Sequence, residues 1–292
     1  MNNLAMTRGE KVFSVFNYVF MLLIIVIFLF PFLSVVMTSF VSTEEYLTRT
    51  GLILIPEKFD FSAYQMIFKN KMIYSAYGIT FFRTIVGTFF QIAITTAMAY
   101  GLSKDDLPGR KPIQVLLMLC LVFPVQIIPQ FLLIKNLGLI NSLWAMIFPW
   151  MMNIQYVFLM IAFFKQVPAS LEEAAIIDGC SHVSIFFRII LPLCLPSVAT
   201  IALFYAVWHW NSWFDAQMFI NDIKLYPMQN LLKRILEVPQ LGDIGGGLED
   251  EPLPSESIKG AVIIITSLPI LCVYPFVQKY FVTGFMMGSV KG

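Results

Sequence analysis

The sequence predicts an all-α membrane protein with six transmembrane helices, and two observations, its composition and its apolar runs, support this. Hydrophobic residues make up 58% of the 292 positions and charged residues only 13%, whereas soluble domains carry about 25% charged residues. Apolar runs of the roughly 20 residues needed to cross a bilayer recur along the chain. The four cysteines show no spacing typical of a disulfide framework or a metal site. We therefore expect helices packed in a bilayer.

The first apolar run has the basic flank of a secretory signal, since Arg8 and Lys11 precede it. It is longer than the roughly 7–15 residues of a signal's apolar region, and no A-x-A cleavage site follows it. We therefore expect a retained span. In order, the spans are expected at 15–40, 73–102, 113–134, 142–164, 189–220 and 260–283.

A single membrane domain, 15–288, is expected between an N-terminal tail, 1–14, and a short C-terminal end, 289–292. An even number of spans places both termini on one side. Lys and Arg are spread almost evenly over the connections, so the positive-inside rule favours cytoplasmic termini only slightly. Prolines inside several spans predict bent or broken helices around a cavity. The main connections are an exterior-type loop at 41–72, a turn at 102–112, a polar segment at 165–188 and a long acidic loop at 221–259.

The polar segment reads as two short helices separated by a break. Ser170-Leu171-Glu172-Glu173 has the spacing of a capping box, and both glutamates would lie at the favourable end of the helix dipole. Gly179 suits a left-handed helix stop. Ser181 is expected to cap a second helix that ends at Ile190, as Pro192 approaches. We expect this segment, 168–190, outside the bilayer.

One face of the first short helix carries the small residues Ala174 and Ala175 beside apolar Leu171, Ile176 and Ile177. Small side chains permit close approach by a partner. A solvated loop is the default for a polar connector. It has no need of a cap, a glycine stop and exposed isoleucines together. We therefore favour a docking helix.

Several residues of the polar segment resemble the signature of a known family. Glu173-Ala174-Ala175, Asp178-Gly179, Phe186, Ile189 and Leu191-Pro192 resemble the cytoplasmic "EAA" signature of ATP-binding-cassette (ABC) importer permeases, with Cys180 where Ala is usual. The tail QKYFVTGFMMGSVKG is similar to those of binding-protein-dependent, maltose-type carbohydrate permeases. The stretch 254–281 most resembles permeases that import oligosaccharides from polysaccharide breakdown.

The resemblance implies a type I importer permease fold, in which the polar segment is the coupling helix seated in a groove of a cytoplasmic ATPase. A change of Gly179 to Asp is then expected to uncouple ATP hydrolysis from transport. The acidic stretch 243–256 has two interpretations, a solvated connector or, by the resemblance, a loop that faces a binding protein. The residues implied for coupling are Glu172, Glu173, Ala174, Ala175, Asp178, Gly179 and Pro192.

The chain has no G-x-x-x-x-G-K-[ST] phosphate loop and no soluble stretch long enough for an ATPase. We therefore expect a non-catalytic subunit without a cofactor or metal of its own, with ATP and Mg bound by a partner. The implied partners are a second homologous permease in a heterodimer, two cytoplasmic ABC ATPase subunits, an extracellular or periplasmic solute-binding protein, the lipid bilayer and a carbohydrate. No basic cluster suggests nucleic acid. The expected location is the bacterial cytoplasmic membrane, with several spans and cytoplasmic termini.

The stretch AVWHWNSWFDAQ, 206–217, is the main candidate for a substrate pathway. Aromatic rings stack on sugar faces while Asn, His and Asp bind hydroxyls, and WNSWFD resembles the W-N-x-F stretch of sugar permeases. An aromatic belt at the membrane interface is the alternative. Arg83 is a costly intramembrane charge, and it is either functional, paired with a neighbour or placed near a membrane interface. The pathway candidates are Arg83, Gln126, Gln130, Asn153, Gln155, Tyr156, Trp208, His209, Trp210, Asn211, Trp213 and Asp215.

Other functions remain open at this level. An importer of a non-sugar solute would share the cytoplasmic signature. An ion-coupled secondary transporter would need carboxylates inside the spans. The charged residues there are Arg83 and Asp215, which do not make a carboxylate pair. A membrane enzyme is disfavoured, because His182 and His209 are far apart and no H-E-x-x-H motif is present.

Overall fold

The computed structural model describes residues 8–49, 53–237 and 255–289, and all regular structure within them is helical. The chain divides into two compact units. Unit one comprises the chain up to Asn70 together with Arg234–Ser267, and unit two comprises Lys71–Lys233 and the chain from Leu268 onward.

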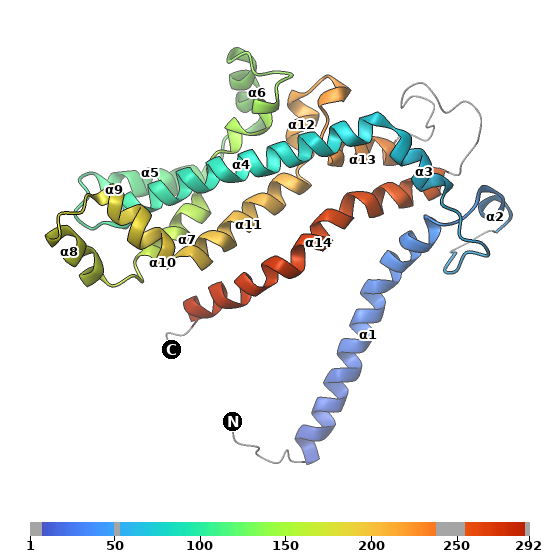
Figure 1. The fold of residues 1–292 in the computed structure, drawn as a ribbon, viewed down its shortest axis with the longest axis horizontal. Coiled ribbons are helices and arrows are strands. Elements are labelled where there is room, and N and C mark those ends of the chain that lie inside the picture. Colours follow the sequence, from blue (N-terminus) through green and yellow to red (C-terminus); the bar gives the residue numbers. More distant parts are fainter. Residues whose placement is uncertain (1–7, 50–52, 238–254, 290–292) are drawn as a thin grey trace. The chain divides into compact units, whose positions relative to one another are not determined.

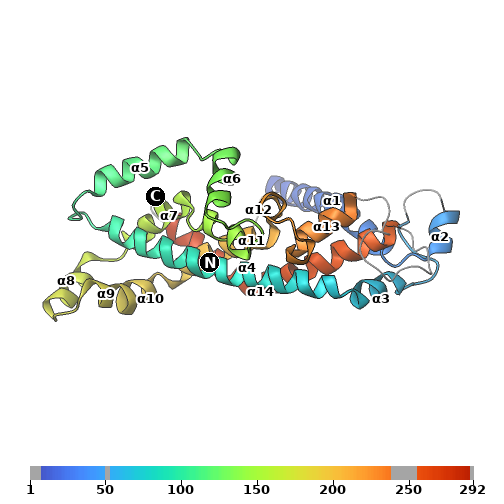
Figure 2. The same cartoon turned by 90° about the horizontal axis from the view of Figure 1, so that it is seen from above.

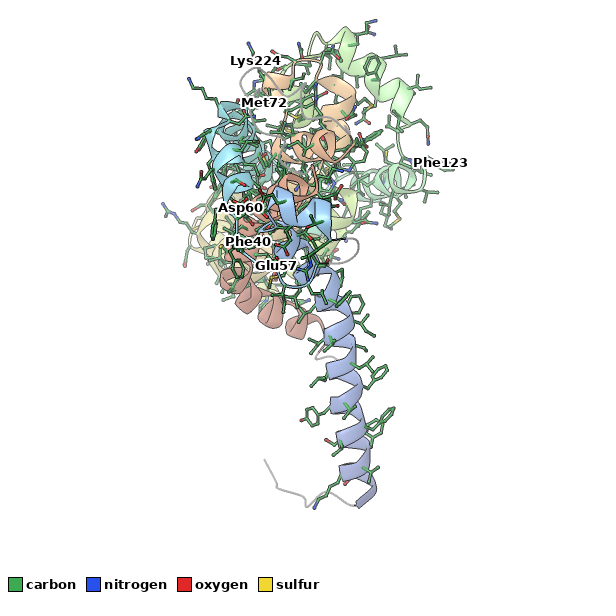
Figure 3. The ribbon with its side chains drawn as sticks, turned by 90° about the vertical axis from the view of Figure 1, so that its right-hand side faces the viewer. Phe40, Glu57, Asp60, Met72, Phe123 and Lys224 are labelled. Carbon is green, nitrogen blue, oxygen red and sulfur yellow. The ribbon has the colours of Figure 1, made fainter. Side chains whose placement is uncertain are left out.

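Unit one is built on α1 (Arg8–Thr38), whose 31 residues are apolar along almost their whole length. Most of its side chains are exposed and project on all sides of the helix (Figure 3). An apolar helix whose side chains are exposed all round requires lipid or another protein around it. The remaining elements are α2 (Thr43–Thr48), α3 (Ser62–Lys69), the end of α13 (Met228–Glu237) and the start of α14 (Ser255–Ser289).

The segment after α1 is held by an aromatic cluster and one carboxylate. Phe40 contacts Phe59, Phe61 and Tyr64 with ring centroids 5.2–5.8 Å apart. Glu45 accepts hydrogen bonds from the backbone N–H of Glu57 at 2.9 and 3.0 Å. Figure 3 shows Phe40, Glu57 and Asp60 gathered beside α2. The described part of the predicted exterior loop, 41–72, therefore contains short helices and fixed side-chain contacts.

Unit two is organised around α4 (Lys71–Ser103), which packs along α11 (Leu195–Asn211) and α7 (Ile154–Phe164) (Figure 1). Ala99, Val157, Met160, Ile190 and Ile201 are fully buried in the core between these helices. The other elements are α5 (Arg110–Val122), α6 (Ile127–Asn136), η1 (Leu143–Met146), η2 (Phe148–Trp150), α8 (Ala169–Ile177), α9 (His182–Ile185), the π turn η3 (Phe186–Ile190), α10 (Leu191–Leu193), α12 (Phe214–Phe219) and η4 (Ile223–Leu225).

Three helices, in α1, α4 and α14, are long and apolar enough to cross a bilayer, and the described residues give up to six spans if each bent pair counts as one. The predicted spans at 73–102 and 260–283 are thus helical throughout, and the span predicted at 15–40 is helical up to Thr38, where α1 ends. The other three are not continuous helices. Their bends are 112° between α5 and α6, 52° between η2 and α7, and 83° between α10 and α11.

The breaks have identifiable causes. Pro124 has no N–H to continue α5, and Figure 2 shows the sharp bend between α5 and α6. Pro149 lies in η2, and Asn153 starts α7 afresh by capping it. Span five, expected at 189–220, is interrupted at Cys194 and ends at Asn211 before α12 begins. The expectation of bent or broken helices is confirmed for these three spans, whereas α14 continues through Pro269 and Pro275 as one helix.

The long acidic connection also contains structure. Its first part forms η4 and the strongly amphipathic α13. Residues 238–254 lie outside the described part of the chain, so both interpretations of the stretch 243–256 stay open.

Candidate functional site

The polar segment of unit two forms a helix, a break and a second helix, as predicted. The capping box is wrong, however: Pro168 occupies the N-cap of α8, and no side chain caps this end. Pro168 has an extended ψ of 128° and the helix starts directly after it, so Ser170 lies inside the first turn. A serine there has a helical backbone and cannot act as the N-cap.

The glycine stop is confirmed. Gly179 has φ +79°, its N–H donates to the Ile176 carbonyl at 3.0 Å, and the Cys180 N–H donates to the Ala175 carbonyl at 2.9 Å. These two bonds form a Schellman motif, which closes a helix with a left-handed residue. The direction of the chain after α8 is therefore fixed by Gly179.

Ser181 caps the second helix as expected, accepting a hydrogen bond from the Ser184 N–H at 3.3 Å. The expected end at Ile190 is wrong, because the helix continues through Pro192 to Leu193. In a regular α-helix the Pro192 ring would clash with the carbonyl of Arg188. That carbonyl lies in the wider π turn η3, a type of irregularity that lets a helix pass such an obstacle.

The implied coupling residues divide by exposure. Glu173, Ala174, Asp178, Gly179 and Pro192 are exposed. Between them Ile177 is 85% exposed, which makes it an apolar projection on the surface.

Two coupling residues face inward instead. Ala175 is buried in the core of unit two. Glu172 forms an ion pair with Lys104, directly after α4. A partner can therefore reach Ala174 and Glu173 more easily than Ala175 and Glu172.

A second set of charges joins helix ends near this segment. Asp105 accepts a hydrogen bond from Lys165 Nζ at 3.3 Å and pairs with Arg110. Lys165 ends α7 and Arg110 begins α5. The ammonium group of Lys165, and then the guanidinium of Arg110, lower the pKa of Asp105 from its ordinary value of 3.8.

An aromatic cavity of about 740 Å³ opens in unit two where α11 ends. Four predicted pathway residues line it, namely Tyr156, Trp208, Asn211 and Trp213. Its walls combine aliphatic and aromatic side chains with few polar groups, as ligand sites commonly do. The remaining lining residues are Leu203, Phe204, Val207, Ser212, Phe214, Ile270 and Val273.

The break after α11 sets the rim of this cavity. Ser212 leaves the helix with an extended ψ of 128°, and α12 then restarts the chain in a new direction. Trp213 is fixed by Asn230, whose Nδ2 donates to the Trp213 carbonyl at 2.8 Å. Lys233 Nζ lies 3.7 Å from the centroid of the Trp213 ring, a cation–π contact. The indole ring is therefore held in place from outside the cavity.

Arg83 and Asp215 do not line the cavity; they pair with each other. Their side chains are 0% and 1% exposed, and Arg83 Nη2 donates to Asp215 Oδ2 at 2.5 Å. Arg83 Nη1 also donates to the Ser212 carbonyl at 3.2 Å, and Ser212 Oγ donates to Asp215 Oδ1 at 2.9 Å. This ion pair anchors the chain at the rim of the cavity to α4. Arg83 is therefore an intramembrane charge that is paired with a neighbour.

His209 and Trp210 also face away from the cavity, into the bundle. His209 packs on Gly87 of α4, where an added Cβ would lie 2.2 Å from His209 Nε2. Within the described residues neither ring nitrogen of His209 has a hydrogen-bond partner. Trp210 packs edge-on against Phe81. Gly87 is therefore required for the close contact of α4 and α11.

The other four pathway candidates do not reach the cavity either. Gln126 and Gln130 belong to the start of α6. Asn153 Oδ1 caps α7 by accepting from Gln155 and Tyr156 N–H groups. Gln155 itself is exposed.

Several residues of the cavity wall and one ion pair were not predicted from the sequence. Phe204, Val207, Trp208 and Asn211 recur at helical spacing on α11, so their common face was detectable. Ile270 and Val273 come from α14, which no spacing along the chain connects to α11. Lys104 belongs to no motif that the sequence reveals. Its ion pair with Glu172 forms only because the fold brings the two residues together.

Among the described residues, no three His, Cys, Asp or Glu side chains gather closely enough to hold a metal ion.

Comparison with known proteins identifies a family model and relatives that this chain matches. Residues 98–287 match the family model described as "Binding-protein-dependent transport system inner membrane component". The chain is 42% identical over 97% of its length to the polygalacturonan/rhamnogalacturonan transport system permease protein YtcP of Bacillus subtilis, covering 99% of that protein. It is 40% identical over 98% of its length to protein LplC of the same organism, covering 97% of it.

A solved structure agrees in fold. A chain of a bacterial ABC transporter involved in the import of the acidic polysaccharide alginate superposes with a TM-score of 0.88 at 29% identity, covering 94% of this chain and 99% of that one. The resemblance drawn from the EAA-like residues is thereby confirmed. The chain belongs to the family of inner-membrane permease components of binding-protein-dependent ABC importers.

Proposed function

We propose that this chain forms half of the translocation pathway of an ATP-driven importer that takes up oligosaccharides released by polysaccharide breakdown. The observation that carries the proposal is the aromatic cavity at the end of α11, with Trp208, Asn211 and Trp213 in its wall. The relatives support the cargo, since YtcP is a polygalacturonan/rhamnogalacturonan permease and AraQ of Bacillus subtilis, 28% identical, is an arabinooligosaccharide permease.

The cavity suits a sugar in its chemistry and in its size. Indole and phenyl faces stack on the C–H faces of a pyranose, while Asn211, Ser212 and the Tyr156 hydroxyl offer hydrogen bonds to its hydroxyls. A volume of about 740 Å³ lies within the range of sites that hold small molecules. Few polar groups are needed, because a pathway must also release its cargo.

The coupling segment supports ATP as the energy source. Glu173, Ala174, Asp178 and Gly179 are exposed beside the projecting Ile177, which gives a rigid helix end with both small and apolar contacts. We propose that two cytoplasmic ATPase subunits, which bind the ATP and Mg, seat this segment. This chain itself is then non-catalytic.

The other partners follow from the same proposal. A second permease would cover apolar surface such as that of α1 and complete the pathway, and a solute-binding protein would deliver cargo from outside. Both termini are then cytoplasmic, with the coupling segment on their side of the membrane.

The experiment is co-purification followed by reconstitution. The chain is expressed with its neighbouring transport subunits, assembled into proteoliposomes and tested with trigalacturonate, arabinotriose, maltotriose and an amino-acid mixture. We expect ATP-dependent uptake of at least one oligosaccharide, and ATP hydrolysis stimulated by the loaded binding protein. Uptake of amino acids only would favour the non-sugar alternative. Uptake driven by a proton gradient without ATP would contradict the proposal.

A further inference from the structure

Helix α4 links the two parts of unit two on which the proposed function depends, namely the coupling segment and the aromatic cavity. Its 33 residues contain no proline and no break, so at 1.5 Å per residue it spans about 50 Å. In Figure 1, α8 and α9 lie by the end of α4 near Ser103, and α12 lies toward the other end. No break therefore separates the two ends of α4.

The end near Ser103 is linked to the coupling segment by one charged contact. Lys104 and Glu172 form an ion pair in which the side chains are 24% and 18% exposed. Lys104 Nζ also lies 4.4 Å from the centroid of the Tyr100 ring, and Tyr100 packs on Phe186 at 5.0 Å. The ion pair therefore lies on an aromatic base shared by α4 and η3, where salt screens it less than on an open surface.

The cavity end of α4 is linked to the wall by several buried contacts. Arg83 holds Asp215 and the Ser212 carbonyl. Thr80 Oγ1 accepts a hydrogen bond from the Met228 N–H at 2.8 Å. Closer to the Ser103 end, the Thr95 and Tyr205 hydroxyls lie 2.7 Å apart and join α4 to α11. A displacement of α4 would therefore carry the rim of the cavity with it.

We propose that the Lys104–Glu172 ion pair is the contact through which the coupling segment moves α4, and that α4 transmits this movement to the cavity wall. Glu172 is then a positioning residue within this chain and not a contact to the ATPase, although the EAA-like motif begins beside it. This inference rests on the proposed function, because the movement originates in an ATPase seated on the coupling segment.

The test measures the accessibility of the cavity directly, and the cargo does not have to be identified first. Val207, which lines the cavity, is changed to Cys in a chain whose four native cysteines are Ser, and the assembled importer is reconstituted. The rate of thiol labelling is measured without nucleotide and after trapping with ATP and vanadate. The variants are Lys104→Glu, Glu172→Lys and the double exchange K104E/E172K.

Lys165→Glu is the matched control. It reverses a neighbouring lysine that pairs with Asp105 and not with α8. ATPase subunits retained on co-purification are measured in parallel for every variant.

We expect trapping to change the labelling rate by about fivefold or more in the parent chain, a typical coupling between distant sites. Each single reversal abolishes the change while retaining the ATPase subunits, and the double exchange restores it. The Lys165→Glu variant behaves as the parent.

Two results would overturn the inference alone. One is an unaltered response in both single reversals. The other is a loss of ATPase subunits in Glu172→Lys that the double exchange does not restore, which would make Glu172 an ATPase contact. If the parent chain itself retains no ATPase subunit, the proposed function fails, and the inference with it.

Discussion

The two ion pairs that link α4 to its neighbours differ in burial, and this difference separates anchoring from transmission. Arg83–Asp215 is fully buried and supplemented by Ser212, whereas Lys104–Glu172 is partly exposed and has only an aromatic ring beneath it. A buried pair cannot open without leaving an unpaired charge in an apolar interior. A partly exposed pair can adjust its geometry at lower cost, because water compensates part of the charge. The first suits a fixed joint, and the second suits a contact that stays paired and transmits movement while its geometry adjusts.

The largest expected effect comes from breaking the buried pair. Arg83→Met leaves Asp215 buried without its partner and should destabilise the chain by about 3–5 kcal/mol. The measurement is thermal unfolding in detergent, followed by the reactivity of the buried Cys194 thiol. The double variant R83M/D215L should recover most of the loss, because apolar replacements of similar volume are often tolerated. A double variant as unstable as the single would show that packing, not charge, dominates the site.

The close contact of α4 and α11 gives the second effect. Gly87→Ala places a methyl group 2.2 Å from His209 Nε2. Displacing the imidazole should cost about 1–3 kcal/mol, the usual range for overpacking. The same unfolding assay in a His209→Ala background serves as the control, since the clash is absent there. If Gly87→Ala is equally harmful in both backgrounds, the contact with His209 is not the cause.

The glycine stop after α8 gives a smaller effect on stability but a visible one on coupling. No atom lies within 4 Å of an added Cβ at Gly179, so the cost of a side chain there is conformational. Gly179→Ala should cost about 1–2 kcal/mol locally because φ is +79°. Gly179→Asn should cost less, since Asn tolerates this region. The uptake per ATP hydrolysed should fall in the order Gly, Asn, Ala, with the Asp variant also uncoupled. An equal ratio in all four would remove Gly179 from the coupling role.

The smallest effect concerns Asp105, whose side chain is 81% exposed. Its folded pKa is lowered by Lys165 and Arg110, so its contribution to stability is present above the ordinary value of 3.8 and is lost as the pH falls through the folded pKa. The difference in melting temperature between the wild type and Asp105→Asn should be small and constant near neutral pH, should begin to fall near 3.8, and should vanish below the folded pKa. A difference that grows on acidification would contradict this sign.

Local chemistry allowed much of this molecule to be predicted from its sequence. Apolar length located α1, α4 and α14, and the backbone freedom of Gly179 located the stop after α8. Pro168 overrode the capping signal of Ser170, because the helix starts where the proline allows it. The aromatic stretch after Val207 was predicted as part of the pathway, but the orientation of each side chain was not. Trp208 and Trp213 face the cavity, while His209 and Trp210 face the bundle. Which side of a helix faces a cavity depends on neighbours distant in the sequence.

The most direct test of the account compares two tryptophans in the reconstituted importer, with the oligosaccharide that gives the strongest uptake. Trp213 lines the cavity, whereas Trp144 packs among Phe82, Phe90 and Phe148 outside its lining. Trp213→Ala should lower uptake about tenfold or more, on the order of one or two lost stacking contacts, with ATPase subunits retained. Trp144→Ala should leave uptake close to the wild type. Equal uptake in the two variants would contradict a sugar pathway through this cavity.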